Sequence, residues 1–146
     1  MKHKGSIEIN QPLNKVATLF ANPENLKEYQ DGFVKKELIS GKKGEVGAVS
    51  KMFYKHGKHK MELVETITKN ALPHSFEASY HHKHMDNTMK CNFVALNENK
   101  TKYEFEYEYT RINWVIPKLI SLLFPSMYRK PAEKWLKQFK EFAERQ

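Results

Sequence analysis

Glu65 is the first candidate for chemistry, because it is a carboxylate among apolar residues. The stretch from Met61 to Ile67 alternates as a strand does, which places Leu63 and Glu65 on the same apolar face. A carboxylate there needs a hydrogen bond, an ion-pair partner, water or a proton. Glu65 is therefore either an acid or ligand anchor in a cavity, or a glutamate near an opening that pairs with a lysine.

The histidines are the second candidate group, since His81, His82 and His84 are close together in the sequence. A metal needs ligands that converge on one point, whereas neighbouring strand residues such as His81 and His82 face opposite sides of a sheet. We therefore expect no metal, haem or iron–sulphur centre, and no cofactor. His82 shares its face with Tyr80 and is a candidate cavity residue.

Cys91 is the one cysteine, so it cannot form a disulfide within the chain. It lies on an apolar face with Met89 and Phe93. It could act as a nucleophile if His82, on the preceding strand, lay beside it as a base. The alternative is a small buried thiol.

Tyrosine hydroxyls are the remaining polar groups on the predicted apolar face. Tyr80 and Tyr107 are central in their strands and can orient polar groups of a ligand. Tyr103 and Tyr109 are nearer to strand ends, where packing alone can explain them.

These side chains need a sheet to position them, and the sequence predicts one. Gly5–Asn10 reads as a first strand, followed by two short helices that begin at Pro12 and Pro23. Period-two alternation then continues through six further strands, which indicates an antiparallel meander with one dry face. These six are 33–40, 48–55, 60–68, 75–82, 88–96 and 102–111, and the turn before the fifth of them is expected at Met85-Asp86-Asn87.

A long amphipathic helix is predicted over Tyr128–Ala143. Trp135, Leu136 and Phe139 recur at helical spacing on one face, and lysines and glutamates fill the other. The helix must lay this apolar stripe on the dry face of the sheet. The preceding apolar stretch from Trp114 to Met127 is either the first part of this helix or a lid over a cavity.

Composition limits the class of protein. The chain has 146 residues with 40% hydrophobic residues and a net charge of +8, which suits one domain over residues 1–146 with a real core. Residues 1–10 lack the apolar core of a secretory signal, so we expect a cytoplasmic protein.

A basic hairpin is predicted around Gly57, and it carries Lys51, Lys55, Lys58 and Lys60. This hairpin can contact an anionic membrane surface or only aid solubility. Few aromatic residues interleave with these lysines, so no specific nucleic acid is expected.

The whole order of elements resembles the START-like (SRPBCC) superfamily, which includes polyketide cyclase/dehydrase-type proteins. The resemblance rests on Ile7–Pro12 with Lys15-Val16, Asn22–Leu26, Ser40-Gly41 with Gly44–Gly47, Met61–Ile67 and Lys134–Phe142. It implies the α+β helix-grip fold: a curved antiparallel sheet of about seven strands around a long C-terminal helix, with two short helices after the first strand. It also implies a cavity between the sheet and that helix.

The predicted function is therefore binding, or transport, of an apolar or aromatic small molecule or lipid in this cavity. The alternatives are a cyclase/dehydrase-type enzyme that uses polar groups such as Glu65, His82 or Tyr107, and a chaperone-activating interaction module. No catalytic residue is assigned. The predicted ligand-binding residues are Leu63, Glu65, Phe76, Tyr80, His82, Met89, Cys91, Phe93, Phe105, Tyr107, Trp135 and Phe139.

Overall fold

The computed structural model describes residues 2–113 and 131–146. The stretch from Trp114 to Met127, predicted as a lid or a helix, lies outside the described residues, as do the first residues of the predicted C-terminal helix. The elements in chain order are β1 (Lys2–Ile9), α1 (Leu13–Ala21), the short 3-10 helix η1 (Pro23–Asn25), α2 (Leu26–Tyr29), β2 (Phe33–Ser40), β3 (Val49–His56), β4 (His59–Ala71), β5 (Ser75–His82), β6 (Met85–Asn97), β7 (Lys100–Ile112) and α5 (Pro131–Glu144).

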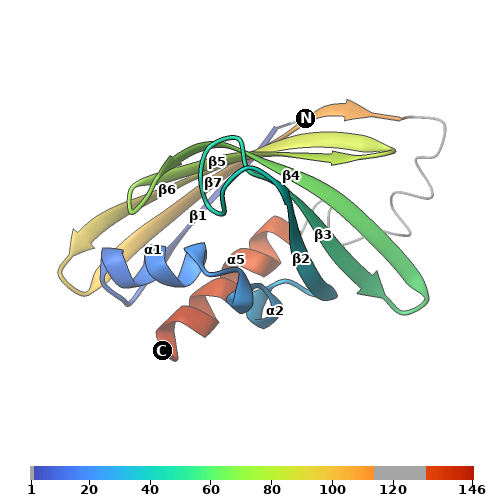
Figure 1. The fold of residues 1–146 in the computed structure, drawn as a ribbon. Helices are drawn as coiled ribbons and strands as arrows, with labels where there is room; N and C mark the ends of the chain where they lie inside the picture. The colour runs from blue at the N-terminus through green and yellow to red at the C-terminus, as the bar shows by residue number, and fades with distance from the viewer. Residues whose placement is uncertain (1, 114–130) are drawn as a thin grey trace.

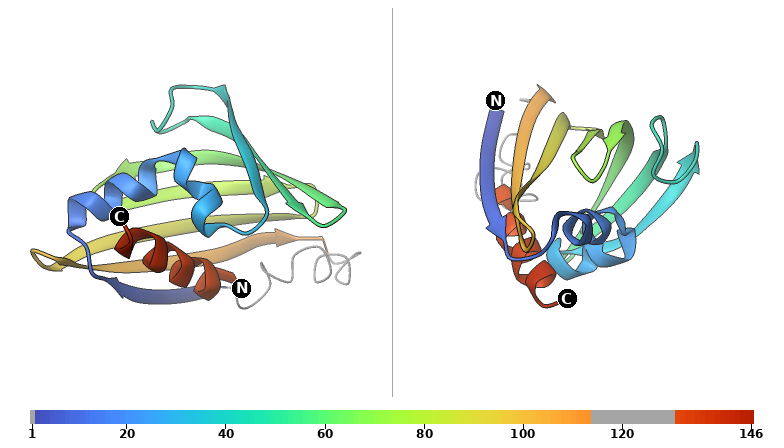
Figure 2. Two further views of the ribbon diagram at one scale, coloured as in Figure 1. Left: turned by 90° about the horizontal axis from the view of Figure 1, so that it is seen from below. Right: turned by 90° about the vertical axis from the view of Figure 1, so that its left-hand side faces the viewer.

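The seven strands form one antiparallel sheet in the order β1-β7-β6-β5-β4-β3-β2. Strands β2 to β7 follow one another as a meander, and β1 is the edge strand beside β7. The sheet is strongly curved, and all the described helices lie on its concave side (Figures 1 and 2). This arrangement confirms the predicted fold class.

The helices after β1 begin where the sequence indicates. Pro12 precedes α1, whose Val16 and Ala17 are buried. The Asn22 side chain accepts a hydrogen bond from the Glu24 backbone N–H at 3.0 Å, and Pro23 occupies the first position of the next turn. Gly32 then ends the segment at a φ of +76°, a conformation that favours glycine.

Helix α5 packs its apolar stripe into the concave side. Leu136, Phe139 and Phe142 are all buried, and the Phe139 ring lies 4.9 Å from the Tyr29 ring of α2. The end of the helix is held near β1, because the Asn10 backbone N–H donates to Glu144 Oε2 at 2.7 Å. The predicted apolar face of this helix is therefore the buried one.

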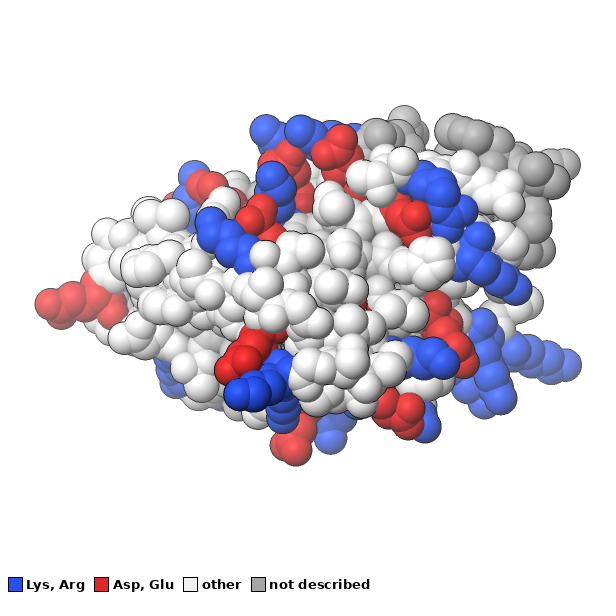
Figure 3. Space-filling view, turned by 45° about the horizontal axis from the view of Figure 1, so that its top comes forward, with Lys and Arg blue, Asp and Glu red and all other residues white. Residues whose placement is uncertain are grey.

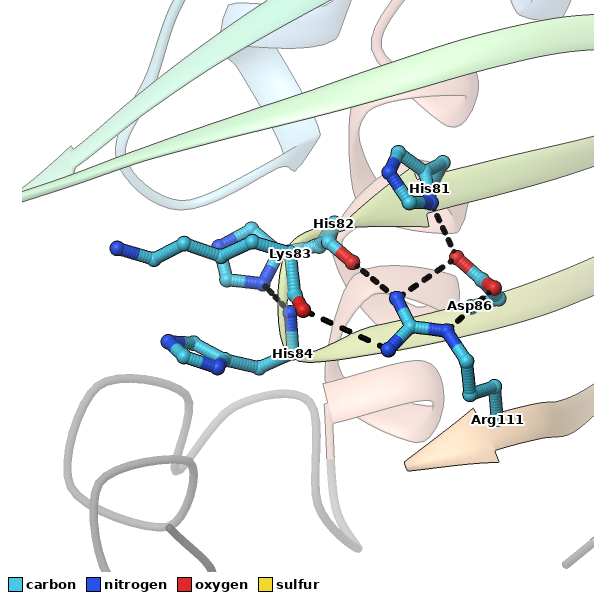
Figure 4. Close-up of polar contacts among 6 residues, drawn as sticks. All are labelled: His81, His82, Lys83, His84, Asp86 and Arg111. Atoms are coloured by element: carbon cyan, nitrogen blue, oxygen red, sulfur yellow. Dashed lines mark hydrogen bonds and ion pairs between the residues drawn. The ribbon is translucent and has the colours of Figure 1, made fainter. Parts of the chain in front are cut away.

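Three predicted boundaries were wrong. Strand β4 ends at Ala71 rather than at Thr68, because its last residues still pair with β5. Strand β1 begins at Lys2 rather than at Gly5, because its whole length pairs with β7. The turn between β5 and β6 lies at Lys83 and His84, so Met85-Asp86-Asn87 belongs to β6. Asp86 is held in the sheet by hydrogen bonds from both neighbouring strands, 2.5 Å from His81 Nδ1 and 2.7 Å from Arg111 Nε (Figure 4).

Candidate ligand cavity

A cavity of about 360 Å³ lies between the concave face of the sheet and the helices. Most of its wall is apolar or aromatic, with Phe20 of α1, Tyr29 of α2 and Phe139 of α5 on the helical side. The sheet contributes Met52, Leu63 and Ile67, among others. A hollow of this size with mainly apolar walls and few polar groups is typical of a small-molecule site.

Nine of the predicted ligand-binding residues line this cavity, and three do not. The nine are Leu63, Glu65, Phe76, Tyr80, Met89, Phe105, Tyr107, Trp135 and Phe139. His82, Cys91 and Phe93 are buried but are not part of its lining. Contact of the nine with a ligand stays a prediction.

A row of polar residues crosses the apolar face of the sheet. The strand register places Ser50 opposite Glu65, Glu65 opposite Tyr80, and Tyr80 opposite Asn87. All four line the cavity, and they come from the adjacent strands β3 to β6. At about 4.8 Å between strands, this polar row is about 14 Å long. It gives the cavity a defined polar side.

Glu65 is the charged centre of this polar row. Its side chain is almost fully buried, and both carboxylate oxygens have partners: Lys36 Nζ lies 2.7 Å from Oε1, and the Tyr80 hydroxyl donates to Oε2 at 2.8 Å. Glu65 thus fits both sequence interpretations at once, as a cavity residue and as the partner of a lysine. Because Lys36 balances its charge, Glu65 is held as an ion pair rather than as a free base.

The phenols around Glu65 are neutral hydrogen-bond donors. Burial, reinforced by the nearby Glu65 charge, raises the pKa of Tyr80 and of Tyr54 well above the usual value. Burial likewise raises the pKa of Tyr29 and Tyr107. The Tyr54 hydroxyl donates to Gln30 Oε1 at 2.7 Å. The cavity therefore offers neutral phenols rather than phenolates.

Two buried polar atoms of the lining have no hydrogen-bond partner among the described residues. They are Asn87 Oδ1 on the sheet and Trp135 Nε1 on α5. Asn87 is 4% exposed, so bulk water does not replace the missing partner. Trp135 stacks against Tyr54, with ring centroids 6.2 Å apart. Buried groups of this kind normally have partners, so both atoms are candidate ligand contacts.

His82 lies at the end of β5, where its Nδ1 accepts a hydrogen bond from the His84 backbone N–H at 3.1 Å (Figure 4). Burial lowers the pKa of His82 to about 4, and electrostatic interactions with His84, Lys83, His81 and Arg111 lower it further. It is therefore a neutral imidazole that holds a turn. In the part of the chain that the structure describes, no three His, Cys, Asp or Glu residues gather as metal ligands.

Cys91 is fully buried in the core, where its Sγ lies 3.4 Å from the Tyr103 hydroxyl. Burial raises the pKa of the thiol to about 12, so it is protonated at neutral pH. This environment supports the buried-thiol interpretation over a nucleophile.

The sequence interpretation missed Lys36, Ser50 and Asn87. The alternation in 33–40 and 48–55 was ambiguous, which left Lys36 and Ser50 unassigned. Asn87 was placed in a turn, although counting back by two from Cys91 through Met89 reaches it. That period-two signal was present and could have identified Asn87 as a cavity residue.

The outer surface carries mixed charges, and basic side chains extend from the end of the molecule where the β3–β4 hairpin lies (Figure 3). Lys55, Lys58 and Lys60 are exposed there, and Lys51 lies 3.8 Å from Glu62. No described helix is long and apolar enough to cross a bilayer.

Comparison with known proteins gives matches in structure but not in sequence. No family model matches the chain, and no curated protein matches it. The Zhui aromatase/cyclase from Streptomyces sp. R1128 is similar with a TM-score of 0.78 and 9% identity over 99% of this chain and 94% of that one. Norcoclaurine synthase from Thalictrum flavum, in complex with dopamine and hydroxybenzaldehyde, has a TM-score of 0.68 and 14% identity over 97% and 85% of the two chains.

A third similar structure is Ara h 8.0201, with a TM-score of 0.70 and 11% identity over 100% of this chain and 99% of that one. These likenesses extend over nearly the whole described fold. They show that the protein has the helix-grip fold, as the sequence resemblance predicts. At such low identities they show the fold alone.

Proposed function

We propose that this protein binds an apolar or aromatic small molecule, or a lipid, in the cavity between the sheet and α5. The observation that carries the proposal is the cavity of about 360 Å³ with rings and aliphatic side chains on both walls. Burying about 200 Å² of apolar ligand surface gives roughly 5 kcal/mol before the costs of association, so an affinity in about the millimolar range is expected. Norcoclaurine synthase, of the same fold, has small aromatic molecules bound in its structure.

The contacts of the polar groups favour binding over the two alternatives. A cyclase/dehydrase-type reaction needs an acid or base with a free site, but both Glu65 oxygens have partners and His82 is outside the lining. A chaperone-activating module would act through its surface and has no need of an internal cavity. Small-molecule binding accounts for the hollow with the fewest additional assumptions.

The test is to fill the cavity from the sheet side. Ala78 is buried on the concave face between Phe76 and Tyr80, which both line the cavity, so we expect the larger indole of Ala78→Trp to extend into the hollow. We expect the neutral environment-sensitive dye prodan to bind the wild type with a blue shift and enhanced emission, and to lose this signal in Ala78→Trp. Ser79→Trp, on the opposite face of β5, is the matched control and should bind like the wild type.

If prodan binds none of the folded proteins, or binds Ala78→Trp as well as it binds the wild type, the proposed function is wrong. A signal that appears only in partly denaturing buffer has the same consequence, because it reports loosened packing rather than a native site.

An anionic membrane surface is the partner that we propose for the basic hairpin. Among the described residues, Lys55, Lys58 and Lys60 have no acidic partner within ion-pair distance, so their charges are available. Neutralising all three to Gln should weaken binding to phosphatidylserine vesicles by on the order of 100-fold at low salt, at about 1 kcal/mol per lysine.

The control neutralises three exposed lysines away from the tip of the β3–β4 hairpin, Lys4, Lys27 and Lys69, which changes the net charge equally. The measurement is the fraction of protein that sediments with the vesicles. If this fraction falls equally in both triple variants, the effect is one of general charge, which contradicts a specific role for the hairpin.

A further inference from the structure

Asn87 is buried in the middle of the cavity wall with an unused hydrogen-bond acceptor. It is 4% exposed, it lines the cavity, and its Oδ1 has no partner among the described residues. Leaving a buried acceptor without a partner is unfavourable for the folded protein. A sheet position facing an apolar cavity would normally carry an apolar side chain, so the amide indicates a role beyond packing.

The neighbours of Asn87 define what a partner must look like. In the polar row, Tyr80 lies opposite Asn87, but its hydroxyl donates a hydrogen bond to Glu65 and is therefore engaged elsewhere. The adjacent row on the sheet is mainly apolar, with Ala78 opposite Met89, and Met89 opposite the phenol of Tyr107. A molecule that lies on this surface meets one hydrogen-bond acceptor beside apolar carbon.

The groups of the polar row argue against an anionic head group beside Asn87. Glu65 and Asn87 Oδ1 are both acceptors, and Lys36 already pairs with Glu65 at 2.7 Å. A ligand carboxylate beside Asn87 Oδ1 would place acceptor against acceptor, and Lys36, already engaged by Glu65, would not neutralise its charge. A neutral hydroxyl avoids both penalties and supplies the missing proton.

We propose that the cavity selects neutral hydroxylated apolar molecules, alcohols or phenols, whose hydroxyl donates a hydrogen bond to Asn87 Oδ1. The same hydroxyl oxygen, or another oxygen of the ligand, can accept from the unpartnered Trp135 Nε1 or from a cavity phenol. This inference rests on the proposed binding function and assigns its ligand class. Asn87 is then the specificity-determining residue, because its free acceptor favours a hydrogen-bond donor over a carboxylate.

The experiment uses three probes that share one ring system and differ in one group. At pH 7, 2-naphthol is a neutral donor, 2-methoxynaphthalene has the oxygen but no proton to donate, and 2-naphthoate is an anion. Isothermal titration calorimetry compares them on the wild type, on Asn87→Leu and on Asn92→Leu. Asn92 lies on the same strand but is exposed, so Asn92→Leu makes the same chemical change outside the cavity.

We expect the wild type to bind 2-naphthol about tenfold more tightly than 2-methoxynaphthalene, the value of one hydrogen bond to a buried acceptor. It should bind 2-naphthoate least tightly. Asn87→Leu should abolish the preference for 2-naphthol by weakening 2-naphthol alone, while Asn92→Leu keeps it. If Asn87→Leu does not fold, Asn87→Ala serves in its place, and the wild-type preference is measured without any variant.

Equal affinities for 2-naphthol and 2-methoxynaphthalene in the wild type, or a preference that survives in Asn87→Leu, would overturn the assignment of Asn87. The tightest binding by 2-naphthoate would overturn the neutral ligand class. In both cases the binding function itself would stand. Failure of all three probes, together with failure of prodan, would overturn the binding function as well.

Discussion

Glu65 shows how a charged residue is accommodated inside an apolar cavity. Lys36 reaches it from β2 and Tyr80 from β5, so partners on two other strands hold one carboxylate. The ion pair cancels the charge, and the phenol satisfies the second oxygen. A pair of this kind contributes little net stability, but removing one partner leaves the other charge buried and uncompensated.

We therefore predict that Lys36→Met destabilises the protein by about 3 kcal/mol. The double variant Lys36→Met/Glu65→Leu should recover most of this loss, because it removes the buried charge as well. Urea denaturation of the two variants and of Glu65→Leu measures the coupling. Equal stability of Lys36→Met and the wild type would mean that the pair is solvated and contributes nothing.

His82 makes a separate prediction about pH. Its pKa is about 4 in the folded protein and about 6.5 in the unfolded chain, so below pH 6.5 the unfolded state binds more protons. The contribution of neutral His82 is complete above pH 6.5 and is lost as the pH falls to 4. This loss approaches roughly 3 kcal/mol.

Melting temperatures measured between pH 7.5 and 4.5 test this, with His82→Gln as the comparison. The wild type should lose stability across this window more steeply than the variant, whose side chain does not titrate. The His84 backbone N–H loses its acceptor when His82 is protonated, which gives the local reason. Parallel pH profiles for the two proteins would contradict the assignment.

Alternation in the sequence was enough to place Glu65, Tyr80 and Met89 on the inner face, because each lies in a strand with regular polar and apolar positions. It could not place Lys36, since β2 is an edge strand with irregular register and mostly exposed side chains. The partner of Glu65 is 29 positions away from it in the sequence and is set by sheet curvature, which no local pattern encodes.

Helix α5 is the element that joins the two sides of the cavity. Its buried face contacts α2 and β1, and its Phe139 ring also lies 5.7 Å from Tyr103 on β7. The spacing of apolar residues predicted this buried face correctly. The cavity itself could not be read from that spacing, because close packing against the sheet would require the same pattern.

Phe139→Ala should therefore destabilise the protein by about 3–5 kcal/mol, because the side chain is 2% exposed and its removal enlarges the cavity. Lys137→Ala, on the exposed face of the same helix, should change stability by less than about 0.5 kcal/mol. Thermal unfolding of both variants is the measurement. Indistinguishable melting temperatures for Phe139→Ala and the wild type would show that α5 is peripheral to the core.

At the scale of the whole molecule, the curved sheet and the helices enclose more space than their side chains fill. An unfilled apolar hollow forfeits dispersion contacts, so it costs stability that a better packed core would keep. A ligand that binds only the folded state returns part of this free energy, about 2.7 kcal/mol at a concentration of 100 times its Kd. The stability gained on binding therefore depends on how well the size of the ligand matches the volume of the cavity.

Ala78 and Met89 allow this coupling to be tested, since they lie opposite each other on β5 and β6 and Met89 lines the cavity. Met89→Ala should enlarge the hollow and shift its preference from naphthalene-sized to pyrene-sized neutral alcohols. The double variant Ala78→Met/Met89→Ala exchanges the two side chains at constant volume and should restore the wild-type preference. The measurement is the rise in melting temperature at a fixed concentration of each alcohol. If all three proteins rank the ligands alike, these probes bind outside the space between the sheet and α5. Only a ligand held in that space would change its ranking when the methionine side chain is removed.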